Sequence, residues 1–244
     1  MRINVMFVIG GLLSLGCGGR GLVKKIDFTS PDVQRSPQGK ACAKDVGLIA
    51  DGENNSNQIA QIQDRGGYWY TFVDDTGSRV VPEAGKNGGT FQMTPGGANG
   101  TKYAARMTGT VGGGSPAYVG MGFNFVDPKG SYDASKYQGI RFWAKKGPGS
   151  IDKVKLKVPD AATDPDGKLC KECYNDFGRD LTLKNEWTEY VVPFYLMKQD
   201  PTWGSPHPAN IDSSKIYSVQ FQFNQTGQPF DLWVDEVEFT GCAG

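Results

Sequence analysis

The segment at residues 153–158 constrains the fold most strongly, because its side chains alternate strictly. Its sequence, KVKLKV, places three apolar side chains on one face of an extended chain and three lysines on the other. Alternation at period two is typical of a β-strand with one buried face. Similar segments recur along the chain, and turn-forming residues separate them, with 34 glycines and 14 prolines in 244 residues. Apolar residues at helical spacing are nearly absent.

These patterns predict an all-β fold. We expect strands at residues 47–53, 67–73, 102–111, 117–126, 137–145, 153–158, 180–183, 187–194, 216–224 and 230–239, and a short one at 90–93 within a glycine-rich loop. Short strands with no helix between them imply antiparallel pairing. The prediction is an antiparallel β-sandwich of the jelly-roll type. The GGGSP turn predicts a hairpin between the strands at 102–111 and 117–126.

The N-terminus has the features of an export signal. Arg2 precedes a short apolar run that ends in small residues before Cys17, which predicts a signal peptide at residues 1–16. Cys17 resembles the lipidated cysteine of bacterial lipoproteins, so we predict a cell-envelope lipoprotein that contacts the membrane through its lipid anchor, with plain secretion as the alternative. Residues 17–46 mix glycine, proline, serine and charge, which predicts a tether. The folded domain is predicted at residues 47–242.

Export makes disulfides the natural interpretation of the other cysteines. Cys42, Cys170, Cys173 and Cys242 allow three pairings. A Cys170–Cys173 bond would close the loop that follows residues 153–158, and a Cys42–Cys242 bond would join the two ends of the domain. We favour this pairing over a zinc site, because there is one CxxC and the sole histidine, His207, is distant in sequence.

Charge balance excludes one class of partner. Lysine and arginine number 26, and aspartate and glutamate also number 26. No net positive field favours nucleic acid. We expect a monomer that does not bind nucleic acid.

Polar side chains of four predicted strands suggest a ligand-binding face. If the strands at 117–126, 137–145, 153–158 and 216–224 share a sheet, its outer face carries Asn124, Arg141, Trp143, Gln220 and Gln222. Amides can bond the hydroxyl groups of a sugar, and an indole ring can stack on a pyranose. The alternative is an ordinary solvated face of an antiparallel sheet.

The long polar loop at residues 159–177 is a second candidate region. It carries Asp160, Asp164 and Asp176, which could bind sugar hydroxyls or calcium, and Trp203 could join them from a proline-rich loop. Connections this long in a compact domain are usually functional. The alternative is a set of aspartate-led turns.

Acidic residues at the two ends of the domain form a candidate calcium site. Asp51 and Glu53 end the first predicted strand, and Asp235 lies in the last, where a shift in apolar parity predicts a β-bulge. First and last strands are often neighbours in a sandwich, and carboxylates suit Ca²⁺. No serine-hydrolase, phosphate-loop or dinucleotide motif is present. A glycan hydrolase that uses Asp164 and Asp176 stays an open alternative.

The segments YQGIRFWAK, WTEYVVPF and FDLWVDEVEF resemble the galactose-binding-like jelly-rolls of carbohydrate-binding modules, family 11 most closely, and of complex I intermediate-associated protein. The resemblance covers about residues 47–242. It implies a non-catalytic sandwich that binds a polysaccharide or oligosaccharide on its concave face and often holds a structural Ca²⁺. Carried over, it implies calcium at Asp51, Glu53 and Asp235 and glycan contacts at Trp143, Gln220 and Gln222. A structural or protein-interaction lipoprotein with the same fold is the alternative.

Overall fold

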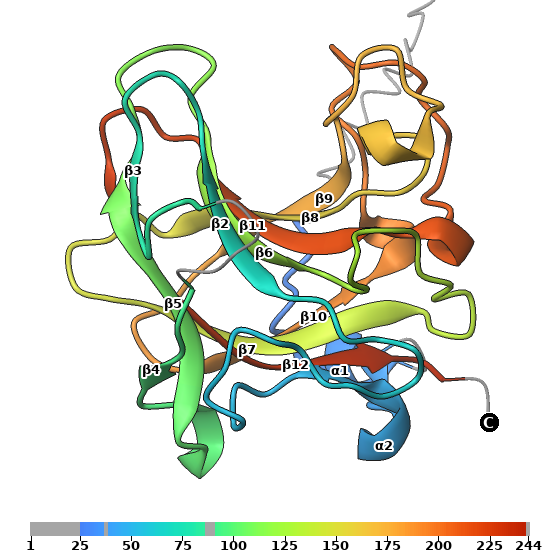
Figure 1. Cartoon of the computed structure of the whole chain (residues 1–244). Helices are drawn as coiled ribbons and strands as arrows, with labels where there is room; N and C mark the ends of the chain where they lie inside the picture. The colour runs from blue at the N-terminus through green and yellow to red at the C-terminus, as the bar shows by residue number, and fades with distance from the viewer. Residues whose placement is uncertain (1–24, 37–38, 86–90, 243–244) are drawn as a thin grey trace, which may run out of the picture.

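The computed structural model describes residues 25–36, 39–85 and 91–242, so the predicted signal peptide and Cys17 lie outside the described residues. Two antiparallel β-sheets pack face to face (Figure 1). The predicted all-β sandwich of the jelly-roll type is confirmed.

One sheet has seven strands. They are β1 (Leu48–Ala50), β3 (Arg79–Val81), β4 (Thr94–Pro95), β5 (Tyr103–Thr110), β7 (Gly139–Lys146), β10 (Thr188–Pro193) and β12 (Pro229–Thr240). Their order is β10-β7-β12-β5-β3, with β1 paired to β12 and β4 paired to β5. The longest strand, β12, therefore lies at the centre of this sheet.

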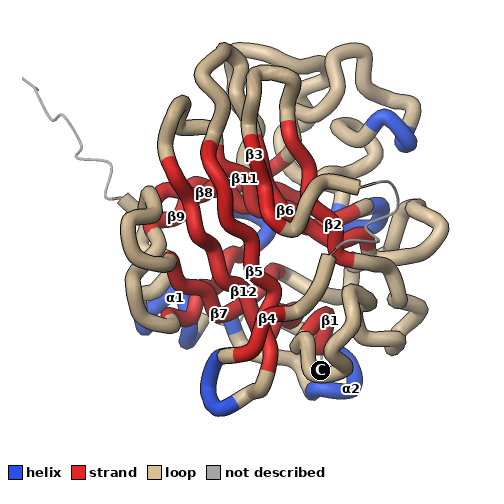
Figure 2. Tube along the Cα trace, turned by 60° about the vertical axis from the view of Figure 1, so that its left-hand side comes forward, coloured by secondary structure: helices blue, strands red, loops and turns tan. Residues whose placement is uncertain are grey.

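The other sheet has five strands. They are β2 (Trp69–Val73), β6 (Val119–Asn124), β8 (Lys153–Val158), β9 (Phe177–Thr182) and β11 (Ser218–Phe223). Their order is β2-β6-β11-β8-β9, and all four pairings are antiparallel. Figure 2 shows β9, β8, β11, β6 and β2 in this order across the molecule, with β7, β12 and β1 of the other sheet below them.

The helices of the described residues are single turns or little more. They are α1 (Pro31–Arg35), α2 (Lys44–Gly47), η3 (Ala98–Gly100), η4 (Pro165–Gly167), η5 (Phe194–Leu196) and η6 (Ser213–Lys215). Within this described part, none is long and apolar enough to cross a membrane.

Part of the predicted tether packs against the sandwich. Phe28 is buried, and its carbonyl accepts a hydrogen bond from the amide of Val191 in β10. Ala41 forms a β-bridge with Thr240 at the end of β12. Residues before Gly47 therefore contribute to the packed domain.

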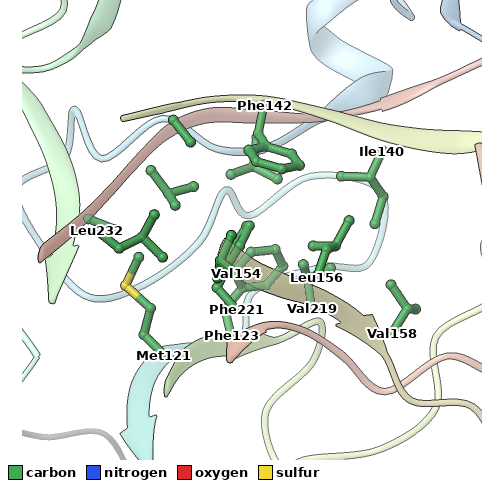
Figure 3. Close-up of a cluster of buried hydrophobic side chains, with 14 of the residues drawn as sticks. Met121, Phe123, Ile140, Phe142, Val154, Leu156, Val158, Val219, Phe221 and Leu232 are labelled. Carbon is green, nitrogen blue, oxygen red and sulfur yellow. The ribbon is translucent and has the colours of Figure 1, made fainter. Parts of the chain in front are cut away.

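The core forms where the apolar faces of the two sheets meet. Figure 3 shows side chains from both sheets interleaved, among them Phe142, Leu156 and Phe221. Phe142 of β7 contacts Phe221 of β11 edge-on, with ring centroids 5.1 Å apart. Phe223 of β11 stacks on Phe230 of β12 at 4.9 Å. Buried aromatic pairs add about 0.5–1.5 kcal/mol each beyond their area of burial.

The β-bulge predicted near Asp235 is confirmed. The pairing of β12 with β7 shifts register between Asp235 and Glu238, and Glu236 has φ of 45°. The extra residue lets Val234 and Val237 both point into the core. Strand β1 pairs with β12 at this point, so the first and last strands are neighbours, as expected.

The predicted hairpin between residues 102–111 and 117–126 is wrong. Strand β5 pairs with β12, β3 and β4, whereas β6 pairs with β2 and β11. The connection between β5 and β6 therefore crosses from one sheet to the other. Each of the two strands contributes side chains to the shared core. Strand β3 was not predicted, and the strand expected at 90–93 begins instead at Thr94, after buried Phe91 and Met93.

The predicted disulfides are both formed. Cys42 is bonded to Cys242 across a sequence separation of 200, and Cys170 is bonded to Cys173 across a separation of 3. The first bond fixes the segment before β1 to the segment after β12.

We expect the two disulfides to differ in their effect on stability. In the chain-entropy estimate, replacing Cys42 and Cys242 by serine lowers the free energy of unfolding by about 5 kcal/mol, because a long loop of the unfolded chain is released. The matched replacement of Cys170 and Cys173 costs about 2 kcal/mol. Urea unfolding of the two double variants measures the difference, and an equal or reversed order would contradict it.

Candidate functional site

The outward face of the five-stranded sheet forms the floor of a groove of about 1210 Å³. Side chains of β2, β6, β8 and β11 contribute to its lining. Loops rise at both ends of the sheet, in cyan and green on one side of Figure 1 and in yellow and orange on the other. The groove is therefore built on rigid strands and bordered by two loop walls.

Aromatic rings of β2 lie over glycines of β6. Trp69 and Thr71 point into the core, so Tyr70 and Phe72 point into the groove. In the pairing register Tyr70 lies opposite Gly122 and Phe72 lies opposite Gly120. A Cβ atom at Gly120 would lie 2.5 Å from Cζ of Phe72. The missing side chains of β6 therefore make room for the aromatic rings.

Amide side chains of β11 occupy the middle of the floor. Nε2 of Gln220 donates to the hydroxyl of Tyr70 at 3.1 Å, and Oε1 of Gln222 accepts from Nζ of Lys157 at 3.1 Å. Burial raises the pKa of Tyr70, so its hydroxyl keeps its proton at neutral pH. Oδ1 of Asn124 is buried and has no hydrogen-bond partner among the described residues. These groups retain donors and acceptors for a ligand.

Lys157 joins the floor to one wall. Its side chain is buried, and Nζ lies 2.8 Å from Oδ2 of Asp176. Nζ also donates to Gln222 and, at 3.3 Å, to the carbonyl of Tyr174. An ammonium group has three donors, and these three contacts use all of them. Breaking a buried ion pair by removing one partner costs about 3–5 kcal/mol, so Lys157 has a structural role.

The first wall consists of the loop at residues 159–176 tied to the segment at 198–206. Nδ2 of Asn175 donates to the carbonyls of Asp200, at 2.7 Å, and Trp203, and its Oδ1 accepts from the amide of Asp200 at 2.9 Å. The Cys170–Cys173 bond closes the tip of the loop. Tyr174 is 64% exposed and Trp203 is 47% exposed at this wall.

The second wall depends on Asp74, which follows β2. Its carboxylate accepts hydrogen bonds from the amide of Tyr118, from the amide and hydroxyl of Thr76 and from the hydroxyl of Ser78. Burial opposes the charged form, but these bonds outweigh it and lower the pKa of Asp74. The ring of Tyr118 lines the groove and is 41% exposed.

The structure brings four of the predicted glycan-binding residues together. Asn124, Trp203, Gln220 and Gln222 line the groove. Tyr68, Tyr70, Phe72, Tyr118 and Tyr174 line it as well but were not predicted. The alternation in residues 67–73 carried the signal for the first three, since Tyr68, Tyr70 and Phe72 share one parity.

The three predicted loop aspartates are buried supports and do not line the groove. Asp160 accepts hydrogen bonds from the amides of Ala162 and Asp212, each at 2.9 Å, and burial raises its pKa. Asp164 caps η4 and lies 2.8 Å from Nζ of Lys129. Asp176 pairs with Lys157. Such turns and caps are the local structures that Asp favours.

Trp143 and Arg141 do not share a face with the glutamines, which corrects the expectation of four strands in one sheet. Strand β7 belongs to the seven-stranded sheet, so both side chains lie on the opposite side of the sandwich. Arg141 forms ion pairs with Glu189 and Glu238. Parity predicts which side chains point outward, but it does not predict which sheet the strand joins.

Two of the three acidic residues predicted to bind calcium, Glu53 and Asp235, contact the segment at residues 98–103. Oε1 of Glu53 accepts from the amides of Lys102 and Tyr103 at 2.8 and 3.0 Å. Oδ2 of Asp235 accepts from the amide of Ala98 at 2.7 Å, and burial raises its pKa to about 6. Asp51 pairs with Lys44 at 3.5 Å. In residues 25–36, 39–85 and 91–242, no three His, Cys, Asp or Glu side chains are grouped to hold a metal, and calcium stays a prediction.

Comparison with known proteins decides the family. The family model of carbohydrate binding domain 30 matches residues 63–241. The chain belongs to the carbohydrate binding domain 30 family. No curated protein matches it. Because of this match, the chain is a carbohydrate-binding module on a β-sandwich. Modules of this kind are generally non-catalytic.

Solved structures of carbohydrate-binding modules share its fold. A family 11 module from Clostridium thermocellum in complex with a β-1,3-1,4-mixed-linked tetrasaccharide aligns with a TM-score of 0.54 and 17% identity, over 81% of this chain and 97% of that one. A family 30 module aligns with a TM-score of 0.52 and 10% identity, over 80% and 97% of the two chains. At sequence identities this low, the comparison shows a shared fold.

Proposed function

We propose that this module binds a polysaccharide or oligosaccharide in the groove of the five-stranded sheet. The observation that carries the proposal is the convergence of aromatic rings and amides on one floor. Tyr70 and Phe72 present rings above β6, and Gln220 and Gln222 present amides beside them. The solved family 11 module that holds a tetrasaccharide supports the ligand class.

The two kinds of side chain have complementary roles. Rings stack on the C–H faces of a sugar and exclude water from it. Amides donate to and accept from neighbouring hydroxyls in one plane. Tyr174 and Trp203 at one wall and Tyr118 at the other extend the aromatic surface beyond the floor. The groove therefore offers stacking and hydrogen bonding along its length.

We expect the double variant Gln220→Ala/Gln222→Ala to lose affinity for its glycan by about tenfold or more, because each lost hydrogen bond contributes about 0.5–1.5 kcal/mol. Calorimetric titration against a glycan panel measures this loss, and thermal unfolding confirms that the variant is folded. Gln92→Ala, at an exposed position outside the groove, is the matched control.

Trp143→Ala provides the opposite test, because it alters the other sheet. It should leave glycan affinity unchanged. Loss of binding with Trp143→Ala but not with the glutamine variant would place the site on the seven-stranded sheet and overturn the proposal.

We further propose that the module is exported and held at a membrane by a lipid on Cys17. Two disulfides support an oxidising compartment, and the pattern of residues 1–17 supports the lipid. Cells that express the full chain should hold it in the membrane fraction, and Cys17→Ser should release it. Retention of the variant would contradict the anchor.

We also propose that Ca²⁺ stabilises the end of the sandwich at Asp51, Glu53 and Asp235. The burial of Asp235 without an ion-pair partner among the described residues supports a cation there, and oxygen donors suit calcium. Added Ca²⁺ should raise the unfolding temperature of the protein, and Asp235→Asn should remove that increase. An equal increase in both proteins would contradict this site.

A further inference from the structure

We propose that the groove selects glycans that carry an anionic substituent, a carboxylate or a sulfate ester, and that Lys155 pairs with it. The inference rests on the proposed function of the groove and names its substrate class. Lys129, Lys155 and Lys157 all line the groove.

Two of these lysines already have carboxylate partners. Nζ of Lys129 lies 2.8 Å from Asp164 and 3.0 Å from Asp166. Nζ of Lys157 lies 2.8 Å from Asp176. Because both charges are compensated within the protein, neither lysine needs a ligand to balance it.

Lys155 differs from them. Its side chain is half-buried, and within the described residues it forms no ion pair and no hydrogen bond. Asp180 lies opposite Lys155 in the register of β8 and β9, but the two form no ion pair. A Cβ atom at Gly178 would lie 3.2 Å from Cε of Lys155, so the lysine stem lies close to that glycine.

Lys155 lies on the floor of the groove between β11 and β9. Lys155 lies opposite Gln222 in the pairing of β8 with β11. Its Cα therefore lies beside the amides of the floor, and its stem passes close to Gly178 of β9. Burial and the neighbouring charge of Lys157 lower the pKa of Lys155, and the carboxylates of Asp180, Asp200 and Asp176 offset this only in part. The net effect disfavours the charged form of Lys155 when no ligand is bound.

An anionic sugar provides the missing partner. Removing an ammonium from water without a counter-ion is unfavourable, and a carboxylate or sulfate oxygen would form a charge-assisted hydrogen bond with it. Asp200 also lines the groove and attracts Lys155 electrostatically, but the two form no ion pair, and Oδ1 of Asp200 accepts from the amide and hydroxyl of Thr202 at 2.8 and 2.6 Å. A neutral glycan would leave Lys155 unpaired, so charge on the sugar should determine selectivity.

The test uses glycans that differ only in charge. Polygalacturonate is compared with its fully methyl-esterified form, and κ-carrageenan with its desulfated form, by calorimetric titration of the folded protein at low and high salt. We expect the charged member of at least one pair to bind about tenfold or more tightly than its neutral form, and salt to reduce this preference. Which pair shows it distinguishes a carboxylate from a sulfate ester.

Variants of one strand provide the control. Lys155→Met should remove the preference, and Lys155→Arg should retain most of it. Lys153→Met changes an exposed lysine on the same face of β8, outside the groove, and should leave the preference unchanged. Equal effects of Lys153→Met and Lys155→Met would indicate non-specific attraction and overturn the inference.

Failure of the inference and failure of the proposed function give different results. Equal binding of charged and neutral glycans that still depends on Gln220 and Gln222 would overturn the role of Lys155 and leave the groove as the binding site. Absence of binding to every glycan by the folded protein would overturn both.

Discussion

The aromatic contacts between the two sheets are the constraint on which the rest of the molecule depends. Phe142 meets Phe221, Phe223 meets Phe230, and Phe125 stacks on Phe239 with centroids 5.6 Å apart. Each contact joins the five-stranded sheet or the loop after β6 to the seven-stranded sheet. Because successive side chains of a strand point to opposite faces, fixing these rings inward fixes the neighbouring residues outward. The amides and lysines of the groove are therefore positioned by the core beneath them.

Much of the fold follows from local patterns. Alternation predicted the long strands, and the slip of apolar parity around Asp235 predicted the bulge that the register of β12 shows. Strand pairing was less accessible, because it depends on which apolar faces fit together across distant parts of the chain. GGGSP suits a tight turn, yet the strands on either side of it join different sheets. Residues 79–81 form a strand of three residues, which is too short to carry a periodic signal.

Part of the candidate site was predictable, because the alternation within a strand shows which side chains point outward. Parity placed Gln220 and Gln222 outward, and the structure places them in the groove. Trp143 also points outward, but its strand joins the other sheet. The aromatic residues of β2 were overlooked because a run of aromatic residues suggests a core strand. Parity places Tyr70 and Phe72 on one face, and the register against Gly120 and Gly122 shows that this face is open to a ligand.

The attachment of both groove walls to the sheet has a thermodynamic consequence. Asn175 ties the first wall together, and Asp74 holds the second, while the floor is hydrogen-bonded backbone. Conformational entropy lost by a protein on association subtracts from affinity. Here most of that entropy is already lost when the chain folds. The freedom that remains to be lost on association belongs mainly to the glycosidic torsions of the sugar and to exposed rings such as Tyr174. Stiff glycans whose free shape already follows the groove should therefore be retained longer than flexible ones of the same composition.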